Sequence, residues 1–228
     1  MLRVLVPALF LLTSTSFVAA VGAQEKKAQK IEGWGDFVDP AGDCKANVKD
    51  DKLTITVPGT QHNLNPLPGY NLLAPRVMQD VDGDFRIQLK VLPCEMPKPD
   101  TSSNKEKPAS YVASGIVLWQ DSNHFSRVLR AGNGERNEFF IHIENFSGGK
   151  IVSGGNLKIN DRAIYLRVDR DKGKITFYRS VDGKNYLVMR PNGPDLVLAD
   201  KVKVGVAVIN STTKEIRHEF EELKVGGK

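Results

Sequence analysis

Residues 114–132 read SGIVLWQDSNHFSRVLRAG, two runs of residues separated by the polar sequence QDSN. The first run is rich in apolar and β-branched residues, and the second alternates apolar residues with polar or charged ones. Both features are typical of β-strands. A short polar connection between two such runs indicates a turn. We therefore predict two neighbouring strands here, and the rest of the chain continues this pattern.

Short runs of the same kind recur along most of the chain. They are residues 52–59, 84–93, 138–146, 163–170, 174–183, 201–210 and 218–225. No segment shows the apolar period of an amphipathic helix longer than a turn or two. The connections DRDKGK and SVDGKNY place Asp and Gly where positive φ angles are needed, which favours hairpins. The predicted fold class is all-β with antiparallel sheets, and residues 97–108 (PKPDTSSNKEKP) are expected to form a long mobile loop.

The N-terminal residues predict an export signal. Arg3 precedes the apolar segment VLVPALFLL, and small residues follow as far as Ala23. The apolar core is shorter than the roughly 20 residues that a membrane span needs, so a transmembrane anchor is the less favoured alternative. We predict a signal peptide at residues 1–23, a flexible lead-in at 24–32 and one domain at 33–228. The mature protein is expected to be secreted or to lie in the periplasm or cell envelope.

The charge pattern excludes an obvious nucleic-acid surface. The formal net charge is +5, and removing residues 1–23 takes away Arg3 and leaves +4. Lysine and arginine residues are interspersed with acidic residues throughout, so no clustered basic footprint appears. No membrane insertion is expected after signal cleavage, and the sequence does not define an oligomeric state.

The chain has two cysteines, Cys44 and Cys94. An exported chain meets an oxidising compartment, so a disulfide between them is the favoured prediction, with two free buried thiols as the alternative. The bond would close a loop of about 50 residues and contribute about 4 kcal/mol in the chain-entropy model. Without clustered histidines, two cysteines at this separation make a poor zinc site. His62 and His124 are expected to be hydrogen-bonding loop residues.

Several longer strings together resemble a known family. They are GWGDFVDPAGDC (33–44), LTITVPGTQHNL (53–64), LLAPRVMQDVDGDFRIQLKV (72–91), the opening stretch, and KVGVAVINSTTKEIRHEFEELKV (203–225). Their order and wording resemble a secreted bacterial family of concanavalin A-like lectin/glucanase sandwiches, a domain of unknown function with a regulation-of-enolase-like label. The resemblance implies a jelly-roll β-sandwich of two antiparallel sheets, whose superfamily relatives bind or cleave carbohydrate on a concave face. It does not name a ligand, and no residue supports a role in enolase regulation.

Alternation along the strands assigns side chains to faces of the sheets. With Ile116, Leu118 and Val128 facing the core, Trp119 and Arg127 point outward. The same rule applied to other strands completes a candidate ligand-binding patch, provided that all the strands share one sheet: Trp119, Arg127, His142, Glu144, Arg167 and Tyr178. Aromatic rings and charged groups suit a saccharide, which offers an apolar ring face and hydroxyls. An ordinary solvent-exposed sheet face, or a Trp119 that belongs to the core, is the alternative.

Catalytic patterns are weak, and no catalytic residue is predicted. A retaining glycosidase needs two carboxyl groups about 5–5.5 Å apart. The nearest arrangement is Glu219 and Glu221, which share a face of a terminal strand but lack the E-x-D-x-E pattern of glucanases of this fold. A nucleophile elbow, an H-E-x-x-H motif and a phosphate loop are all missing.

The sequence Asp80-Val-Asp82-Gly-Asp84 has the spacing of calcium ligands on a tight turn. It lacks the later glutamate of an EF-hand loop, and Asp-Gly is also a strong hairpin signal, so an ordinary turn is favoured. No cofactor is predicted beyond this weak calcium candidate. The favoured function is a non-catalytic module that binds extracellular carbohydrate. The alternatives are a structural or protein-interaction module of the cell envelope and, third, a glycoside hydrolase or lyase.

Overall fold

The computed structural model describes residues 29–227, whose regular structure consists of two sets of strands. One set comprises β1 (Gln29–Ile31), β2 (Gly35–Val38), β5 (Arg76–Asp82), β7 (Tyr111–Trp119), β8 (Phe125–Asn133), β9 (Glu138–Ser147), β10 (Lys150–Ile159) and β14 (Lys201–Asn210). The other comprises β3 (Lys45–Lys49), β4 (Lys52–Val57), β6 (Phe85–Val91), β11 (Ile164–Asp171), β12 (Lys174–Ser180), β13 (Leu187–Met189) and β15 (Ile216–Gly227). The predicted signal peptide, residues 1–23, lies outside the described residues.

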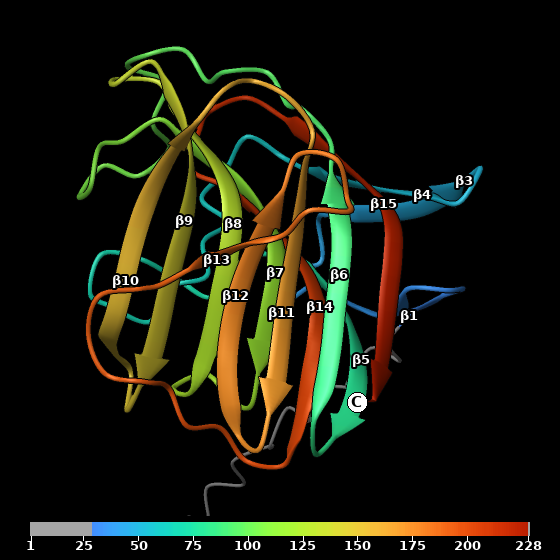
Figure 1. The fold of residues 1–228 in the computed structure, drawn as a ribbon. Helices are drawn as coiled ribbons and strands as arrows, with labels where there is room; N and C mark the ends of the chain where they lie inside the picture. The colour runs from blue at the N-terminus through green and yellow to red at the C-terminus, as the bar shows by residue number, and fades with distance from the viewer. Residues whose placement is uncertain (1–28, 228) are drawn as a thin grey trace, which may run out of the picture.

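The two sets form two antiparallel sheets (Figure 1). The larger sheet has the order β1-β2-β5-β14-β7-β8-β9-β10, and the smaller sheet has the order β13-β12-β11-β6-β15-β4-β3. The all-β prediction of two antiparallel sheets is therefore confirmed. Strand β1 covers residues assigned to the lead-in and pairs with β2, so regular structure begins before Gly33. Within the described range, no helix has the length and apolar character needed to cross a membrane.

The opening stretch forms the hairpin β7–β8, as its alternation indicated. Trp119 lies opposite Phe125 at the turn end, and Tyr111 lies opposite Asn133 at the other end. The predicted face assignment is also confirmed, because Ile116, Leu118 and Val128 belong to the core between the sheets. Their neighbours along the strands point to the other face of the larger sheet.

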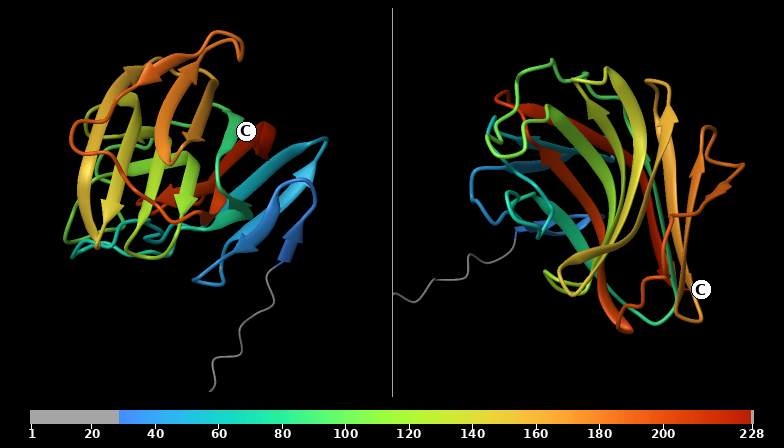
Figure 2. Two further views of the ribbon diagram at one scale, coloured as in Figure 1. Left: turned by 60° about the horizontal axis from the view of Figure 1, so that its bottom comes forward. Right: turned by 90° about the vertical axis from the view of Figure 1, so that its left-hand side faces the viewer.

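The main core lies between the two sheets, which face each other as two layers (Figure 2). Ile55, Leu89 and Leu166 come from the smaller sheet, and Ile116 and Val206 come from the larger one; each is at most 1% exposed. Complete burial of such a side chain stabilises the fold by about 1.5–3 kcal/mol. The apolar residues at every second position of the strands therefore supply the side chains that hold the two sheets together.

A second apolar cluster lies on the outer face of the larger sheet. Its members include Val117, Phe125 and Leu129 from the hairpin, together with Leu64 and Ala74 from the connection between β4 and β5. This connection, residues 58–75, covers part of the outer face. An antiparallel sheet commonly leaves one face to solvent, but here the loop buries apolar residues on both faces.

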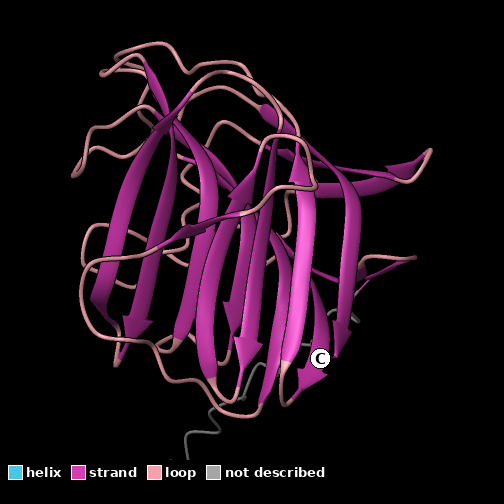
Figure 3. Cartoon of the chain, viewed as in Figure 1, coloured by secondary structure: helices cyan, strands magenta, loops and turns pink. Residues whose placement is uncertain are grey.

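The connection predicted to be a mobile loop, residues 97–108, is anchored at several points. It is part of the connection between β6 and β7, and Figure 3 draws the connections between strands in pink. The carboxylate of Glu135 accepts hydrogen bonds from the backbone N–H groups of Asp100 and Ser110. The carbonyl of Thr101 accepts a 2.7 Å hydrogen bond from the backbone N–H of Thr213. These bonds hold the loop beside the outer face of the larger sheet.

The predicted disulfide between Cys44 and Cys94 is absent, and both cysteines are free. Cys44 directly precedes β3, and its sulfur lies 3.5 Å from Oδ1 of Asp43. Cys94 follows β6, and its sulfur accepts a 3.0 Å hydrogen bond from Nη1 of Arg130. Burial raises the pKa of the Cys94 thiol. The prediction is wrong because each sulfur lies in its own polar cluster, which the spacing of cysteines along the chain does not reveal.

Candidate binding pocket on the outer face of the larger sheet

A pocket of about 290 Å³ lies on the outer face of the larger sheet, where the loops before β5 and β7 meet it. Small-molecule sites commonly start at about 300 Å³. Five lining residues are Tyr111, Arg127, Phe140, His142 and Glu144 on β7, β8 and β9. The others are Asn63, Asn65, Tyr70, Lys107, Ala109, Asn133, Arg136, Asn156 and Ser211.

Strand register brings the charged lining residues together. Arg127 on β8 lies directly opposite Glu144 on β9, and Leu129 lies opposite His142. Side chains two residues apart on a strand share a face, so His142 and Glu144 point to the same side. Three of the six predicted patch residues, Arg127, His142 and Glu144, therefore meet in this pocket, as alternation indicated.

These side chains form a continuous hydrogen-bond network. Arg127 donates from Nε to Oε2 of Glu144 at 2.9 Å and also from Nη2 to the same oxygen. His142 Nε2 lies 3.3 Å from Oε1 of Glu144, and His142 Nδ1 lies 3.0 Å from the Tyr111 hydroxyl. One tautomer satisfies every group: Tyr111 donates to Nδ1, and Nε2–H donates to the carboxylate. The network therefore orients the imidazole and fixes its tautomer.

The network is buried, and its charges are paired. Arg127 is 4% exposed and Glu144 is 9% exposed. Burial alone would raise the pKa of Glu144, but the charge of Arg127 and the hydrogen bond from His142 outweigh it and lower the pKa to about 2. Burial raises the pKa of the Tyr111 hydroxyl. At neutral pH Glu144 is thus ionised and Tyr111 is protonated.

Amide donors above this network have no protein partner. The Oδ1 atoms of Asn65 and Asn133 accept hydrogen bonds from the backbone N–H groups of Leu67 and Arg136 at 3.0 and 2.9 Å, which fixes both amides. Within residues 29–227, the Nδ2 groups of these two asparagines and the side-chain amide of Asn156 have no hydrogen bond. The pocket therefore offers polar groups to a ligand.

Trp119 lies outside this pocket and is not the exposed platform that the patch hypothesis required. The guanidinium of Arg76 lies 4.5 Å from the centre of its ring, and the ring of Phe125 lies 4.9 Å away. The indole is half-buried against the second apolar cluster. Its remaining surface faces a separate hollow lined by Asp80 and Lys203. Trp119 thus combines a packing role with partial exposure.

Arg167 and Tyr178 do not join the pocket, which corrects the prediction of a single six-residue patch. They lie on β11 and β12 of the smaller sheet, directly opposite each other. The Arg167 guanidinium lies 4.2 Å from the centre of the Tyr178 ring. Alternation correctly places both side chains on one face, but it does not say which sheet a strand joins.

Two of the three aspartates of the calcium candidate, Asp80 and Asp84, have separate partners. Asp80 Oδ1 is paired with Nζ of Lys203 at 2.8 Å. Asp84 accepts hydrogen bonds from the backbone N–H groups of Lys172 and Gly173 at 2.8 and 3.3 Å. The segment forms the turn between β5 and β6, where Gly83 has a φ of 70°. A left-handed φ favours glycine, so the Asp-Gly pair supplies the hairpin turn.

Several pocket residues were missed from the sequence. Tyr111 precedes Trp119 by eight residues, an even spacing, so alternation along β7 could have placed it on the same face. Asn65 and Tyr70 lie in a loop that has no periodic signal. Their position depends on the packing of the loop over the sheet. The sequence therefore predicts the floor of the pocket better than its walls.

Comparison with known proteins finds structural similarity without sequence similarity. No family model and no curated protein sequence matches the chain. A functionally unknown protein from Saccharomyces cerevisiae is similar over 86% of this chain and 97% of its own, with a TM-score of 0.68 and 14% identity.

Two further structures cover most of both chains. A legume lectin-like domain from Entamoeba histolytica covers 85% of this chain and 89% of its own, with a TM-score of 0.51 and 13% identity. A β-1,3-1,4-glucanase (lichenase) from a mouse hindgut metagenome covers 80% and 83%, with a TM-score of 0.51 and 9% identity. At these identities the similarity shows the fold alone. The chain has the concanavalin A-like sandwich fold that lectins and glycanases share.

Proposed function

We propose that this chain is an exported, non-catalytic module that binds a saccharide in the pocket on the outer face of the larger sheet. The observation that carries the proposal is the combination of unpartnered amide donors with aromatic walls above a buried, ionised network. Export rests on the predicted signal peptide. Relatedness to the secreted regulation-of-enolase-like family rests on the sequence strings.

The lining chemistry matches what a sugar presents. Tyr70, which is 37% exposed, offers a ring surface to the apolar face of a pyranose, and Phe140 lines the pocket but is only 7% exposed. The free amides of Asn65, Asn133 and Asn156 offer donors to hydroxyl groups, since an amide can donate two hydrogen bonds. A pocket with apolar walls and a few oriented polar groups is the usual design of a small-molecule site.

The carboxylates favour binding over hydrolysis. Among residues 29–227, Glu144 is the only carboxylate that lines the pocket, and its low pKa makes it a poor proton donor. A retaining or inverting glycosidase uses two carboxyl groups. Glu219 and Glu221 lie on β15 in the other sheet, where lysines at 3.3 and 3.0 Å neutralise them.

A glycan array probed with the purified mature chain tests the proposal. Glycans that bind are then titrated calorimetrically against wild type, Tyr70→Ala and Arg136→Ala. Each change should weaken binding by about tenfold, which corresponds to about 1.4 kcal/mol. Arg217→Ala is the matched control, because Arg217 is an exposed arginine on β15 of the smaller sheet. An array without binding, or an equal loss in the control, would contradict the proposal.

A further inference from the structure

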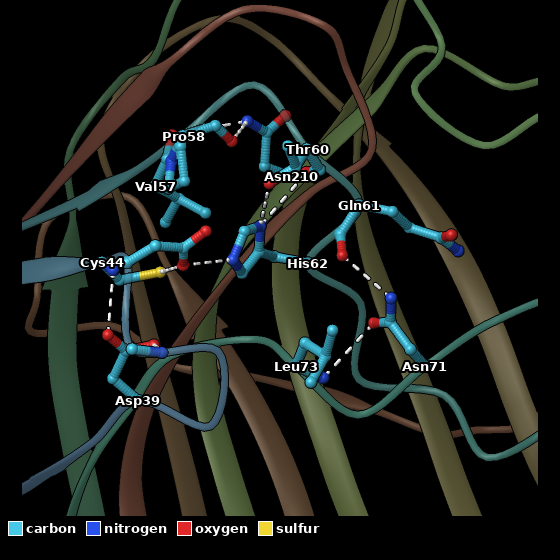
Figure 4. A network of polar contacts seen from close by, with 12 residues as sticks. Asp39, Cys44, Val57, Pro58, Thr60, Gln61, His62, Asn71, Leu73 and Asn210 are labelled. Carbon is cyan, nitrogen blue, oxygen red and sulfur yellow. Dashed lines mark hydrogen bonds and ion pairs between the residues drawn. The ribbon is translucent and has the colours of Figure 1, made fainter.

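Three side chains with different metal-ligating atoms meet outside the binding pocket. The carboxylate of Asp43, the thiol of Cys44 and the imidazole of His62 place their ligand atoms within 4.8 Å of one another. Asp43 Oδ1 lies 2.8 Å from Nε2 of His62 and 3.5 Å from the sulfur of Cys44. Figure 4 shows Cys44 and His62 in this cluster, and dashed lines mark the contacts of the Cys44 sulfur and the His62 ring.

These separations suit a tetrahedral zinc ion. Zinc binds sulfur at about 2.3 Å and nitrogen or oxygen at about 2.0–2.2 Å, so two of its ligand atoms lie roughly 3.3–3.8 Å apart. The distance from oxygen to sulfur already falls in this range. The distance from oxygen to nitrogen, 2.8 Å, needs to open by about 0.5 Å, and the sulfur and the nitrogen, which lie within 4.8 Å of each other, need to settle at about 3.6 Å. A thiolate and an imidazole select zinc or a softer metal over calcium and magnesium, which prefer oxygen ligands.

The groups around the three side chains hold them in place. Nδ1 of His62 lies 3.2 Å from the carbonyl oxygen of Thr60. A metal-ligating histidine usually donates its other ring N–H to such an acceptor, which directs the remaining nitrogen to the metal. Asp39 accepts hydrogen bonds from the backbone N–H groups of Gly42 and Cys44 at 3.0 and 2.9 Å. The turn that carries Asp43 and Cys44 is therefore fixed before any ion binds.

Burial leaves one open side. His62 is 1% exposed and Cys44 is half-buried, whereas the side chain of Asp43 is 45% exposed. An ion among the three would thus contact solvent on the Asp43 side. Three protein ligands and one water complete a tetrahedral zinc site.

We propose that Asp43, Cys44 and His62 bind a zinc ion, with water as the fourth ligand. The ion joins the turn before β3 to the start of the loop at residues 58–75. Asn63 directly follows His62 and, with Asn65 and Tyr70, lines the binding pocket. The zinc site therefore stabilises a wall of that pocket, but its existence does not depend on carbohydrate binding.

Cobalt substitution tests the site directly. Metal-free protein, prepared with a chelator, is titrated with Co²⁺ and then with Zn²⁺. Wild type should develop a near-ultraviolet thiolate-to-cobalt charge-transfer band and the intense visible bands of tetrahedral cobalt, and one equivalent of Zn²⁺ should remove them. Cys94→Ser is the matched control, because it removes the other cysteine and should leave the spectrum unchanged. Cys44→Ser should abolish the charge-transfer band.

A thermal measurement adds a readout that does not depend on the thiol absorption. Zn²⁺ should raise the Tm of wild type and Cys94→Ser, because an ion that binds only the folded state stabilises it. It should raise the Tm of Cys44→Ser and Asp43→Ala less, with affinity weaker by at least about tenfold. Folded wild type without the cobalt band would overturn the proposal, and so would a band lost in Cys94→Ser but kept in Cys44→Ser.

Discussion

Glu144→Gln is expected to destabilise the protein by about 3 kcal/mol at neutral pH. The carboxylate accepts two hydrogen bonds from Arg127 and lies 3.3 Å from His142, and the pair is almost fully buried. Removing one partner of a buried ion pair typically costs about 3–5 kcal/mol, because the other charge stays buried. The glutamine oxygen still accepts a hydrogen bond, and the Arg127 Nη1 bond to the carbonyl of Leu64 remains. The lower end of the range therefore applies.

The pKa of Glu144 gives a second route to this magnitude. In the folded protein the pKa is lowered to about 2, from an ordinary value of 4.5. A carboxyl whose folded pKa lies below its unfolded pKa contributes stability that is complete above the unfolded value and is lost as the pH falls to the folded value. The difference corresponds to about 3 kcal/mol, at 1.36 kcal/mol per pKa unit. This contribution of Glu144 to the free energy of unfolding is present at neutral pH and disappears between about pH 5 and pH 2.

Urea unfolding of wild type and Glu144→Gln across this pH range provides the assay. The difference in unfolding free energy should be about 3 kcal/mol at neutral pH and should shrink as the pH falls towards about 2. Glu138→Gln is the control on the same strand, because Glu138 forms only looser ion pairs, at 3.7 and 3.9 Å, with exposed partners. It should cost less than about 1 kcal/mol. A Glu144→Gln effect below about 1 kcal/mol, or one independent of pH, would refute the reasoning.

Three further predictions concern residues outside the pocket network. Trp119→Ala should lower the unfolding free energy by about 2 kcal/mol in urea melts, because the indole is half-buried against Phe125; a cost near zero would contradict its packing role. Asp84→Ala should cost about 1 kcal/mol through two lost backbone hydrogen bonds, and Ca²⁺ should leave the wild-type Tm unchanged. Alkylation of denatured, unreduced protein should label both Cys44 and Cys94 by intact mass, and an unlabelled pair would show a disulfide.

The local part of the fold could be predicted from the sequence. Alternation within residues 114–132 places Ile116 in the core and Arg127 on the outer face, and both positions are found. These assignments depend on a period of two residues and a short turn. Arg167 shows the limit of this reasoning, because its strand pairs with β6, more than 70 residues away in the chain. The two-residue alternation within a strand does not reveal which distant strand pairs with it in the sheet.

The contacts that bring Cys44 and His62 together could not be predicted from the sequence for a different reason. Cys44 and His62 appeared unrelated in the sequence, yet Asp43 lies beside both side chains. Their meeting requires the turn fixed by Asp39 and the pairing of the His62 backbone with Asn210 on β14. Neither interaction has a periodic signature, because the turn at Asp39 and the segment that carries His62 both lie outside the regular strands.

The buried pair of Arg127 and Glu144 lies beside an apolar cluster, and this position argues for a role in ligand binding. Replacing a buried ion pair with apolar residues of similar volume is often neutral or stabilising. Leu129 and Phe140 already pack on the same face, so an apolar pair would extend the second cluster. The charged pair instead orients His142 at the floor of the pocket.

The double variant Arg127→Met, Glu144→Leu separates stability from binding. It should unfold within about 1 kcal/mol of wild type in urea, because it leaves no unpaired buried charge, whereas Glu144→Gln does. It should nevertheless lose binding to any glycan found on the array, because His142 loses the carboxylate that orients it. A double variant as unstable as Glu144→Gln would show that the pair is needed for folding. A double variant that binds glycan as tightly as wild type would show that the Arg127–Glu144–His142 network does not contribute to binding.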